Sequence, residues 1–375
     1  MDEEKRKKIE TWYDENRTYH DTYCIKIKNL LEEIIKMKRV PYQSITSRVK
    51  GKKSFLEKCK KDKYNDPINE IMDIIGVRII AYTNSDVLAI CKIIENEFII
   101  DKENSINKSD QLGDNEFGYL SMHYVVKLNK RRSTLPEYET FKCIKVEIQV
   151  RTLLQHAWAE IEHDRNYKFG GVLPKEIKRR FFLAAGILEM VDREFQNISD
   201  DIDRYVNSVK NKNDKDILNV SVDSTSLFEY MSRRFSYIWV SKTFNKRDKE
   251  IIDELCNYGI RKIKDIEDLI PPDFIEINEK IGINMNFVSL LITLMIINNA
   301  ERYFEKSCNN HWNQFADGTE RLLQNYNLPL DLIKQKYNIL SYNESDDDDI
   351  GYEPDDNSVF DSEGYEPDDN SLSFN

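Results

Sequence analysis

The sequence predicts an α+β fold, in which helices flank a mixed β-sheet and a mainly helical second domain and a disordered acidic tail follow. Three observations lead to this prediction. Strand-like segments are interspersed with helical segments over the first half of the chain, residues 216–340 show mainly helical patterns, and the last segment repeats one acidic phrase. Strands and helices that follow one another in this way are typical of a sheet covered by helices.

The chain opens with a predicted amphipathic helix over residues 9–38. Its apolar positions recur at helical spacing; they are Tyr23, Ile27, Leu30, Leu31, Ile34 and Ile35. Pro41 follows and ends the helix. Residues 36–63 are then dense in Lys and Arg, with only Glu57 and Asp62 of opposite sign.

Three strands are expected next. Residues 74–81 are apolar on both faces, as in a central buried strand. Residues 118–128 and 144–150 give the second and third strands, and the third alternates strictly between apolar and polar side chains. A helix over residues 84–97 connects the first strand to the second.

The next helices are expected over residues 152–167 and from Pro174 onward. The second of them carries an unbroken heptad seam, made of Ile177, Phe181, Ala184, Leu188, Val191, Phe195, Ile198, Ile202, Tyr205 and Val209. We favour packing of this seam within the chain, with residues 9–38 as a candidate partner, over a subunit interface. A homo-oligomer therefore stays open.

Composition divides the chain into three predicted parts, residues 1–210, 216–340 and 341–375. The last part carries thirteen acids and no base, so the remainder has 55 basic and 54 acidic residues and a net charge of +1. The tail has too few apolar residues to fold alone, and we expect it to be disordered. Unpaired cysteine spacing, a charged N-terminal segment and no apolar stretch of membrane-spanning length predict a cytoplasmic protein without membrane segments.

Polar side chains gather on one face of two predicted strands. In the third strand these are Lys145, Glu147, Gln149 and Arg151; in the second they are Tyr119, Ser121 and His123. A carboxylate, an amide and a guanidinium in one row can bind a metal, a nucleotide edge and a phosphate, and an aromatic ring suits stacking on a base. An ordinary half-solvated strand has the same period, so both interpretations stay open.

Two further features point to phosphate chemistry. Asp73 precedes the first strand, where a carboxylate can ligate Mg²⁺ or simply end a turn. Arg78 faces the other way in an ideal strand, so both residues line one site only if Asp73 lies outside it. Upstream, Arg48, Lys50, Ser54 and Lys58 can clamp a triphosphate.

His156, Glu160 and His163 share one face of the helix predicted over residues 152–167. Their spacing is not that of a zinc protease. We expect them to be polar residues that border a nucleotide site.

Four segments, in this order, resemble the RelA/SpoT synthetases, the alarmone synthetases. They are SRVKGKKSFLEK (47–58), DIIGVRI (73–79), GYLSMHY (118–124) and EIQVRTLLQHAWAEIEHDRNYK (147–168). The resemblance implies a nucleotidyltransferase-like sheet and a GTP diphosphokinase. In that reaction the 3′-hydroxyl of GDP or GTP attacks the β-phosphorus of ATP, which gives (p)ppGpp and AMP.

The resemblance also implies residue roles. Asp73 and Glu147 are the expected Mg²⁺ ligands, and Glu147 is also placed to take the 3′-hydroxyl proton. The expected ATP contacts are Arg48, Lys50, Ser54, Lys58 and Arg78. The expected acceptor contacts are Tyr119, which would stack on guanine, and His123, Gln149 and Arg151.

Two alternatives stay open because fold and family do not fix the substrate. In synthetases of this family the loop before the second strand is expected to be basic, yet here Lys102 and Lys108 face five acids, which favours a toxin-like enzyme that pyrophosphorylates the 3′ end of tRNA. The other alternative is a non-catalytic guanine-nucleotide sensor, against which the intact Asp73 and Glu147 argue.

Overall fold

The computed structural model describes residues 3–107, 121–168, 174–235, 246–282, 286–308, 315 and 317–340. The chain divides into two compact units, Met1–Asp203 and Arg204–Asn375. The tail expected to be disordered, residues 341–375, lies outside the described residues. The predicted limits of 1–210 and 216–340 for the two folded parts stay a prediction.

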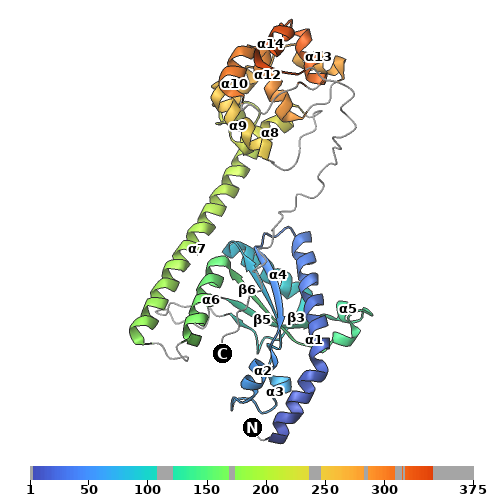
Figure 1. Cartoon of the computed structure of the whole chain (residues 1–375), viewed down its shortest axis with the longest axis vertical. Helices are drawn as coiled ribbons and strands as arrows, with labels where there is room; N and C mark the ends of the chain where they lie inside the picture. Colours follow the sequence, from blue (N-terminus) through green and yellow to red (C-terminus); the bar gives the residue numbers. More distant parts are fainter. Residues whose placement is uncertain are drawn as a thin grey trace. The chain divides into compact units, whose positions relative to one another are not determined.

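The first unit is built on a mixed sheet, as predicted, but the sheet has six strands, and the sequence had indicated three of them (Figure 1). Its strands are β1 (Ser44–Val49), β2 (Ile75–Ala81), β3 (Phe98–Ile100), β4 (Ile106–Asn107), β5 (Met122–Leu128) and β6 (Val146–Thr152). Their order is β1-β2-β6-β5-β3, with β4 also beside β5. β2 and β6 run parallel, whereas the other pairs are antiparallel.

Four of the helices of this unit were predicted, and they occur in the predicted order with small differences at their ends; three short helices were not predicted. They are α1 (Glu3–Met37), α2 (Lys52–Cys59), α3 (Pro67–Glu70), α4 (Asn84–Glu97), α5 (Lys130–Ser133), α6 (Leu153–Lys168) and α7 (Lys175–Lys210). α1 begins before residue 9, because Glu3 and Glu4 place negative charge at its N-terminal dipole. α4 has the predicted limits, and Thr83 and Asp86 form a capping box at its start.

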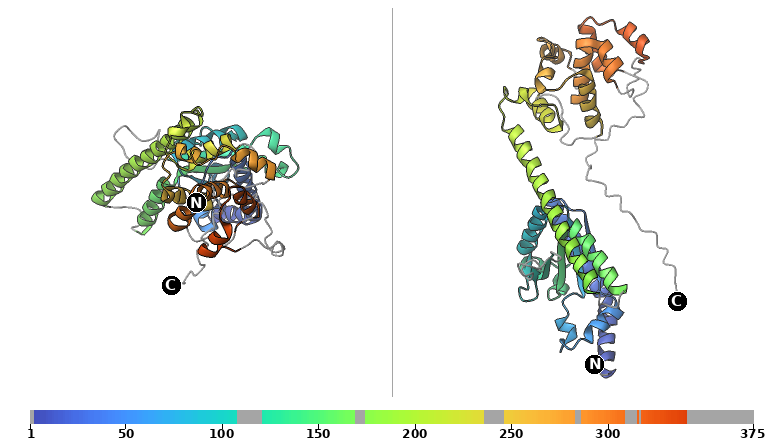
Figure 2. Two further views of the ribbon diagram at one scale, coloured as in Figure 1. Left: turned by 90° about the horizontal axis from the view of Figure 1, so that it is seen from above. Right: turned by 90° about the vertical axis from the view of Figure 1, so that its left-hand side faces the viewer.

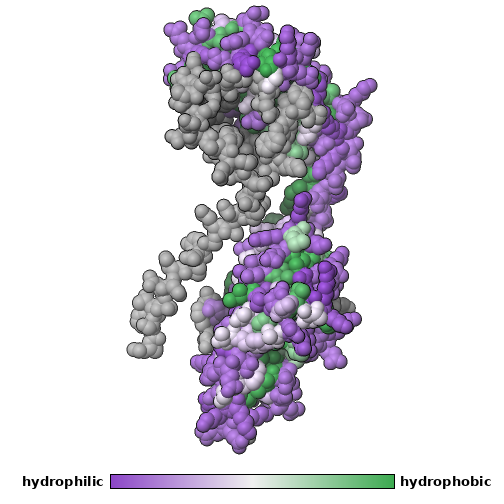
Figure 3. All heavy atoms as spheres, turned by 90° about the vertical axis from the view of Figure 1, so that its right-hand side faces the viewer, coloured by the Kyte–Doolittle hydropathy of each residue, from purple (hydrophilic) through white to green (hydrophobic). Residues whose placement is uncertain are grey.

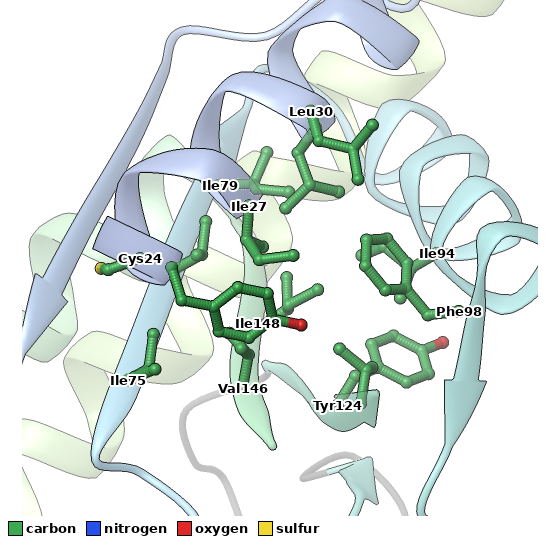
Figure 4. Packing of buried hydrophobic residues seen from close by; sticks show 14 of the residues in the cluster. Cys24, Ile27, Leu30, Ile75, Ile79, Ile94, Phe98, Tyr124, Val146 and Ile148 are labelled. Carbon is green, nitrogen blue, oxygen red and sulfur yellow. The ribbon is translucent and has the colours of Figure 1, made fainter. Parts of the chain in front are cut away.

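The main core lies between the sheet and the pair α1 and α4. Figure 4 shows Ile27 and Leu30 of α1 and Ile94 of α4 turned toward Ile79 and Ile148 of the two central strands. α6 lies on the other side of the sheet (Figure 1). Because side chains alternate along each strand, the face opposite the core is free to carry polar groups.

Two strand limits differ from the prediction. β6 begins at Val146 rather than at residue 144, since Ile144 closes a turn by donating its backbone N–H to the carbonyl of Phe141 at 3.0 Å. Lys145 is then outside the strand and binds Asp101, with 2.7 Å between Nζ and Oδ2. β5 begins at Met122; residues 118–120 of the predicted second strand lie outside the described part of the chain.

The prediction that the α7 seam packs inside the chain is wrong for most of its length. Val191, Phe195, Ile198 and Ile202 are exposed. α7 meets α6 and β6 through other positions, as the hydrogen bonds Trp158–Phe181 and Thr152–Asp192 show. Figure 2 shows α7 of the first unit in front of α6 in its right-hand view. Of the seam, Val209 is buried, and it belongs to the core of the second unit.

The second unit is helical, as predicted. Its helices are α8 (Ser224–Arg234), α9 (Lys246–Tyr258), α10 (Ile263–Glu267), α11 (Phe274–Ile281), α12 (Phe287–Arg302), α13 (Asp317–Asn325) and α14 (Leu330–Tyr337). α12 buries Leu290, Leu291 and Leu294 at the centre of this unit. Its apolar stretch is therefore a core helix, and among the described helices none is both long and apolar enough to cross a bilayer.

The surface is mainly hydrophilic, and the cysteines are unpaired, as their spacing in the sequence predicted. In Figure 3 most of the coloured surface of each unit is hydrophilic, with hydrophobic side chains between. None of the six cysteines is in a disulfide, and Cys24, Cys59 and Cys91 are buried. The thiols thus form no disulfide framework.

Candidate active site

A cleft of about 260 Å³ opens on the polar face of the sheet, over β1, β2 and β6. Its lining combines two carboxylates, two guanidinium groups and an amide. The lining residues are Thr46, Ser47, Arg48, Asp73, Gly76, Val77, Arg78, Glu147 and Gln149. Five of the residues singled out from the sequence therefore meet in one cavity.

Strand register explains why they meet. Gly76 of β2 lies between Arg48 of β1 and Glu147 of β6. In the next row on the same face, Arg78 lies beside Gln149, which in turn lies beside His123 of β5. The residues therefore form two rows, in which cationic groups lie on one side and the carboxylate and its partners on the other.

Gly76 forms the open floor between these groups. A Cβ at this position would approach no atom outside its immediate chain neighbours more closely than 4.0 Å, the distance to the backbone oxygen of Arg48. The space over Gly76 is therefore part of the cleft itself. A side chain there would occupy the cleft without disturbing the strand beneath it.

Asp73 lies just before β2, outside the regular strand, and this placement brings it to the same cleft as Arg78. Its Oδ2 atom accepts from two lysines, at 3.0 Å from Lys50 Nζ and 2.8 Å from Lys58 Nζ. Burial opposes the charge, but the hydrogen bond from Lys58 and the charge of Lys50 outweigh it, so the pKa of Asp73 is lowered. Oδ1 of Asp73 is buried and has no hydrogen-bond partner.

Glu147 is held by the two residues beside it. Its Oε1 lies 3.2 Å from His123 Nδ1, and its Oε2 accepts from Gln149 Nε2 at 2.9 Å. Burial and the nearby charge of Asp73 raise the pKa of Glu147, yet the hydrogen bonds from His123 and Gln149 outweigh both and lower it. Both carboxylates of the cleft are therefore ionised at neutral pH.

Arg151 is the last member of this chain of contacts and binds Gln149. It is almost fully buried, and its Nη2 donates to Oε1 of Gln149 at 3.3 Å. The donor fixes which way the Gln149 amide points, because the other end of that amide must then present its NH₂ to Glu147. In this structure Arg151 orients the row of polar groups rather than lining the cleft.

Sequence reasoning missed the partner of Arg78. Glu160 of α6 binds it, with 2.8 Å between Oε1 and Nη1. His156, one turn earlier, places Nδ1 3.6 Å from the same oxygen. Burial and then the charges of Arg151 and Arg78 lower the pKa of His156, so its ring is neutral at pH 7. Helical spacing predicted that Glu160 and His156 share one face of the helix. Spacing alone does not show which strand that face packs against, so the contact with Arg78 of β2 was missed.

Not every described residue of the predicted site lines the cleft. Ser54 is exposed on α2 and does not line it, although Lys58 on the same helix reaches Asp73. Tyr119 lies outside the described residues. Lys52, which belongs to the segment dense in Lys and Arg (residues 36–63), binds Asp14, with 2.6 Å between Nζ and Oδ2.

The carboxylates fit a Mg²⁺ ion shared with a nucleotide. Within the described ranges no group of three or more His, Cys, Asp and Glu residues is arranged to hold a metal alone. Mg²⁺, however, usually takes one or two carboxylates and completes its shell with water and substrate phosphates. Asp73 and Glu147 both line the cleft and offer carboxylate oxygens to such an ion. Oδ1 of Asp73 is buried and has no hydrogen-bond partner, so it is available as a ligand.

Comparison with known proteins gives one consistent result. Residues 47–172 match the family model described as "Region found in RelA / SpoT proteins". The chain is 32% identical over 168 residues to GTP pyrophosphokinase YjbM of Bacillus subtilis, covering 43% of this chain and 74% of that protein. It is 28% identical over 170 residues to GTP pyrophosphokinase YwaC of the same organism, covering 44% and 76%. A solved GTP pyrophosphokinase family protein from Streptococcus pneumoniae is 30% identical, with a TM-score of 0.44 and coverage of 52% and 95%.

Proposed function

This chain belongs to the RelA/SpoT family of pyrophosphotransferases, and on that premise we propose that it is a GTP diphosphokinase that makes (p)ppGpp from ATP and GDP or GTP. One observation carries the proposal. Two ionised carboxylates, Asp73 and Glu147, line one cleft together with two arginines. Phosphoryl transfer needs positioning and charge neutralisation more than covalent help from the protein, and this set of groups supplies both.

Arg48 and Arg78 are the proposed ATP clamps. They line the cleft on neighbouring strands, beside Asp73. A guanidinium offers a flat face for the adenine and a fork for phosphate, so either group suits ATP. Lys50 and Lys58 lie at hydrogen-bond distance from Asp73, which supports the proposal that these two cations also contact the triphosphate.

Asp73 and Glu147 are the proposed Mg²⁺ ligands. When bound, the ion neutralises negative charge on the transferring phosphates. Their lowered pKa values keep both carboxylates in the form that a metal requires.

Glu147 is also the proposed acceptor of the 3′-hydroxyl proton. The 3′ oxygen forms a bond to the β-phosphorus of ATP, the bond from that phosphorus to the bridging α–β oxygen breaks, and AMP leaves with the bridging oxygen. Because the pKa of Glu147 is lowered, it is a weak base and contributes mainly by orientation. His123 and Gln149 fix that orientation from both carboxylate oxygens.

A second candidate keeps the chemistry and replaces the acceptor by the 3′ end of tRNA. It is supported by the exposed Lys53, Lys60 and Lys61 and by the acids in the loop before β5, one of which, Asp101, pairs with Lys145. A tRNA enzyme would lose activity steeply with salt, since phosphate contacts release counterions. A guanine-nucleotide sensor without catalysis is the third candidate.

A label-transfer assay separates these candidates. The chain is incubated with Mg²⁺ and γ-labelled ATP, and GDP, GTP or bulk tRNA is offered separately. We expect label on GDP or GTP and release of AMP, abolished by Glu147→Gln but not by Glu57→Gln, an exposed carboxylate on α2. Label on tRNA alone would replace the proposal by the second candidate, and nucleotide binding without AMP would replace it by the third.

The free cysteines also support a cytoplasmic location, where thiols stay reduced. This location is part of the proposal. Epitope detection in fractionated cells of the source organism tests it directly.

A further inference from the structure

The two lysines that bind Asp73 reach it from different parts of the chain. Lys50 follows the last residue of β1, and Lys58 lies on α2. Their ammonium groups lie 3.0 Å and 2.8 Å from the same carboxylate oxygen. A lysine has a long flexible side chain, so its ammonium keeps one position only where the backbone that carries it is itself fixed. The two backbones must therefore be held in place relative to each other.

Both peptide groups beside the Cα atom of Lys50 are hydrogen-bonded. The Lys50 N–H donates to the carbonyl of Ile74 at 2.8 Å, which continues the pairing of β1 with β2. The Lys50 carbonyl accepts from the hydroxyl of Tyr13 on α1 at 2.7 Å. These two bonds fix the direction in which the Lys50 side chain leaves the backbone. The first bond belongs to the sheet, whereas the second depends on one side chain of α1.

The ring of Tyr13 contacts the helix that carries the other lysine. It stacks on the ring of Phe55, with 5.4 Å between the centroids and 30° between the planes. Both residues are buried, and α2 lies beside the N-terminal half of α1 (Figure 1). Phe55 is three residues before Lys58 on α2, and residues three apart are neighbours on a helix surface. Tyr13 therefore holds the chain at Lys50 by its hydroxyl and the chain near Lys58 by its ring.

Arg17, one turn further along α1, orients the Tyr13 hydroxyl. Its Nη1 donates to the hydroxyl oxygen of Tyr13, and its Nε donates to Oδ2 of Asp21 at 2.8 Å. Because a guanidinium only donates, the Tyr13 oxygen accepts from Arg17 and directs its own hydrogen to the Lys50 carbonyl. Hydrogen bonds in such a chain polarise one another, which strengthens the bond to Lys50. The hydroxyl is therefore fixed from both sides.

We propose that Tyr13 is a positioning residue for ATP, which holds Lys50 and Lys58 at Asp73 from outside the cleft. None of the residues that line the cleft in the described part of the chain comes from α1. The inference rests on the proposed function, because it takes the triphosphate of ATP as the ligand of the two lysines. Removing the Tyr13 hydroxyl would loosen Lys50 and leave the ring on Phe55, so a single substitution separates the two contacts.

Tyr13→Phe tests the hydroxyl, and Tyr19→Phe is the matched control. Tyr19 also lies on α1, stacks on Phe141 with 4.7 Å between the centroids and donates to the backbone carbonyl of Thr140, away from the cleft lining. Calorimetric titration of the full chain with ATP and Mg²⁺, without an acceptor, measures the ATP dissociation constant. We expect Tyr13→Phe to raise it about two- to tenfold, as the loss of one neutral hydrogen bond would, and Tyr19→Phe to leave it unchanged. Equal dissociation constants for Tyr13→Phe and the wild type would overturn the inference.

A double-mutant cycle shows whether Tyr13 acts through Lys50. In a Lys50→Ala background, Tyr13→Phe should have no further effect on the ATP dissociation constant, because no ammonium is left to position. In steady-state assays Tyr13→Phe alone should raise the KM for ATP and leave the KM for the acceptor unchanged. Additive effects of the two substitutions, or a rise in both KM values, would show a general structural role and contradict positioning.

The positioning role and the proposed function fail in different ways. If Tyr13→Phe weakens ATP binding as expected but no label reaches GDP or GTP, the GTP diphosphokinase is overturned and the positioning role stands. If label is transferred and Tyr13→Phe binds ATP as the wild type does, only the positioning role is overturned. A wild type that binds no ATP would overturn both.

Discussion

Glu160 of α6 lies 2.8 Å from Arg78 of β2, measured from Oε1 to Nη1, so one of the two arginines that line the cleft already binds a carboxylate of the protein. The Glu160 side chain is 55% exposed, whereas that of Arg78 is 26% exposed. An ion pair with one open partner is easily exchanged for another anion. Glu160 therefore occupies the guanidinium that we assign to ATP and competes with its phosphates.

Glu160→Gln should bind ATP more tightly than the wild type. The exposed pair is worth at most about 1 kcal/mol, so the ATP dissociation constant should fall by no more than about fivefold. Calorimetric titration with ATP measures this dissociation constant directly. Glu162→Gln, two residues further along α6, is the control. Weaker binding would contradict competition and would mean that Glu160 holds Arg78 in place for ATP.

Gly76→Val should block the cleft while the first unit stays folded. A Cβ at this position meets nothing closer than 4.0 Å, and a β-branched residue suits a strand. The added methyl groups would instead occupy the space between Arg48 and Glu147. We expect loss of ATP binding, a smaller loss for Gly76→Ala, and little change in thermal unfolding.

The two Gly76 variants form a graded series, so the readouts separate obstruction from damage. ATP affinity should fall in the order Gly, Ala, Val, whereas circular dichroism melts should overlay. A melting temperature that falls in the same order would show that the glycine is needed for the strand itself.

The sequence predicted the sheet and the membership of the site better than it predicted the partners within it. Apolar periodicity places Ile75, Val77 and Ile79 in the core and so leaves Arg78 on the other face. Period alone does not give register, because register depends on turns and on neighbouring strands. Neither the Arg78–Glu160 pair nor the two lysines on Asp73 could therefore be assigned beforehand.

For the heptad seam of α7, the sequence predicted the helix and its apolar positions but not what they pack against. Heptad spacing correctly found the helix and its apolar stripe, but spacing does not name what covers the stripe. The buried Asp192 explains why the inner face was misjudged: its carboxylate is bound by a Thr152 hydroxyl, a contact between residues forty positions apart. Such a pair turns a polar position inward and leaves apolar positions outside.

Asp73 should make the folding stability depend on acid pH. Its pKa is lower in the folded than in the unfolded chain, so its ionised form stabilises the fold at pH values above the unfolded pKa. This stabilisation is lost as pH falls through the folded pKa, below 3.8. Urea unfolding from neutral pH downward should therefore show a steeper loss of stability for the wild type than for Asp73→Asn.

The ion pair of Lys58 with Asp73 should also make the folding stability depend on alkaline pH. Its pKa is raised by Asp73 despite the opposing effect of burial, so the stabilisation persists below the unfolded lysine pKa and is lost as pH rises through the folded one. Asp73→Asn should remove the alkaline loss as well. Identical pH profiles for wild type and variant would contradict a role for this pair in stability.

The hydrogen bond from the Thr152 hydroxyl to Asp192 should be one of the main ties between β6 and α7. The two oxygens are 2.6 Å apart, Thr152 is fully buried and Asp192 is 4% exposed. Thr152→Val keeps the shape of the side chain but removes the donor, which leaves a buried carboxylate without this bond. Burial raises the pKa of Asp192 and the Thr152 bond opposes that rise, so losing the donor should raise it further.

Loss of the donor should cost about 1–3 kcal/mol in the free energy of unfolding at neutral pH. Asp192→Asn is the matched variant, because its amide oxygen still accepts from Thr152 while the buried charge disappears; it should be less destabilising than Thr152→Val. At a pH where Asp192 is protonated, the Thr152→Val penalty should shrink. Urea titrations of the three proteins at both pH values measure this, and a penalty for Thr152→Val that does not change with pH would show that the lost energy comes from packing and not from the carboxylate.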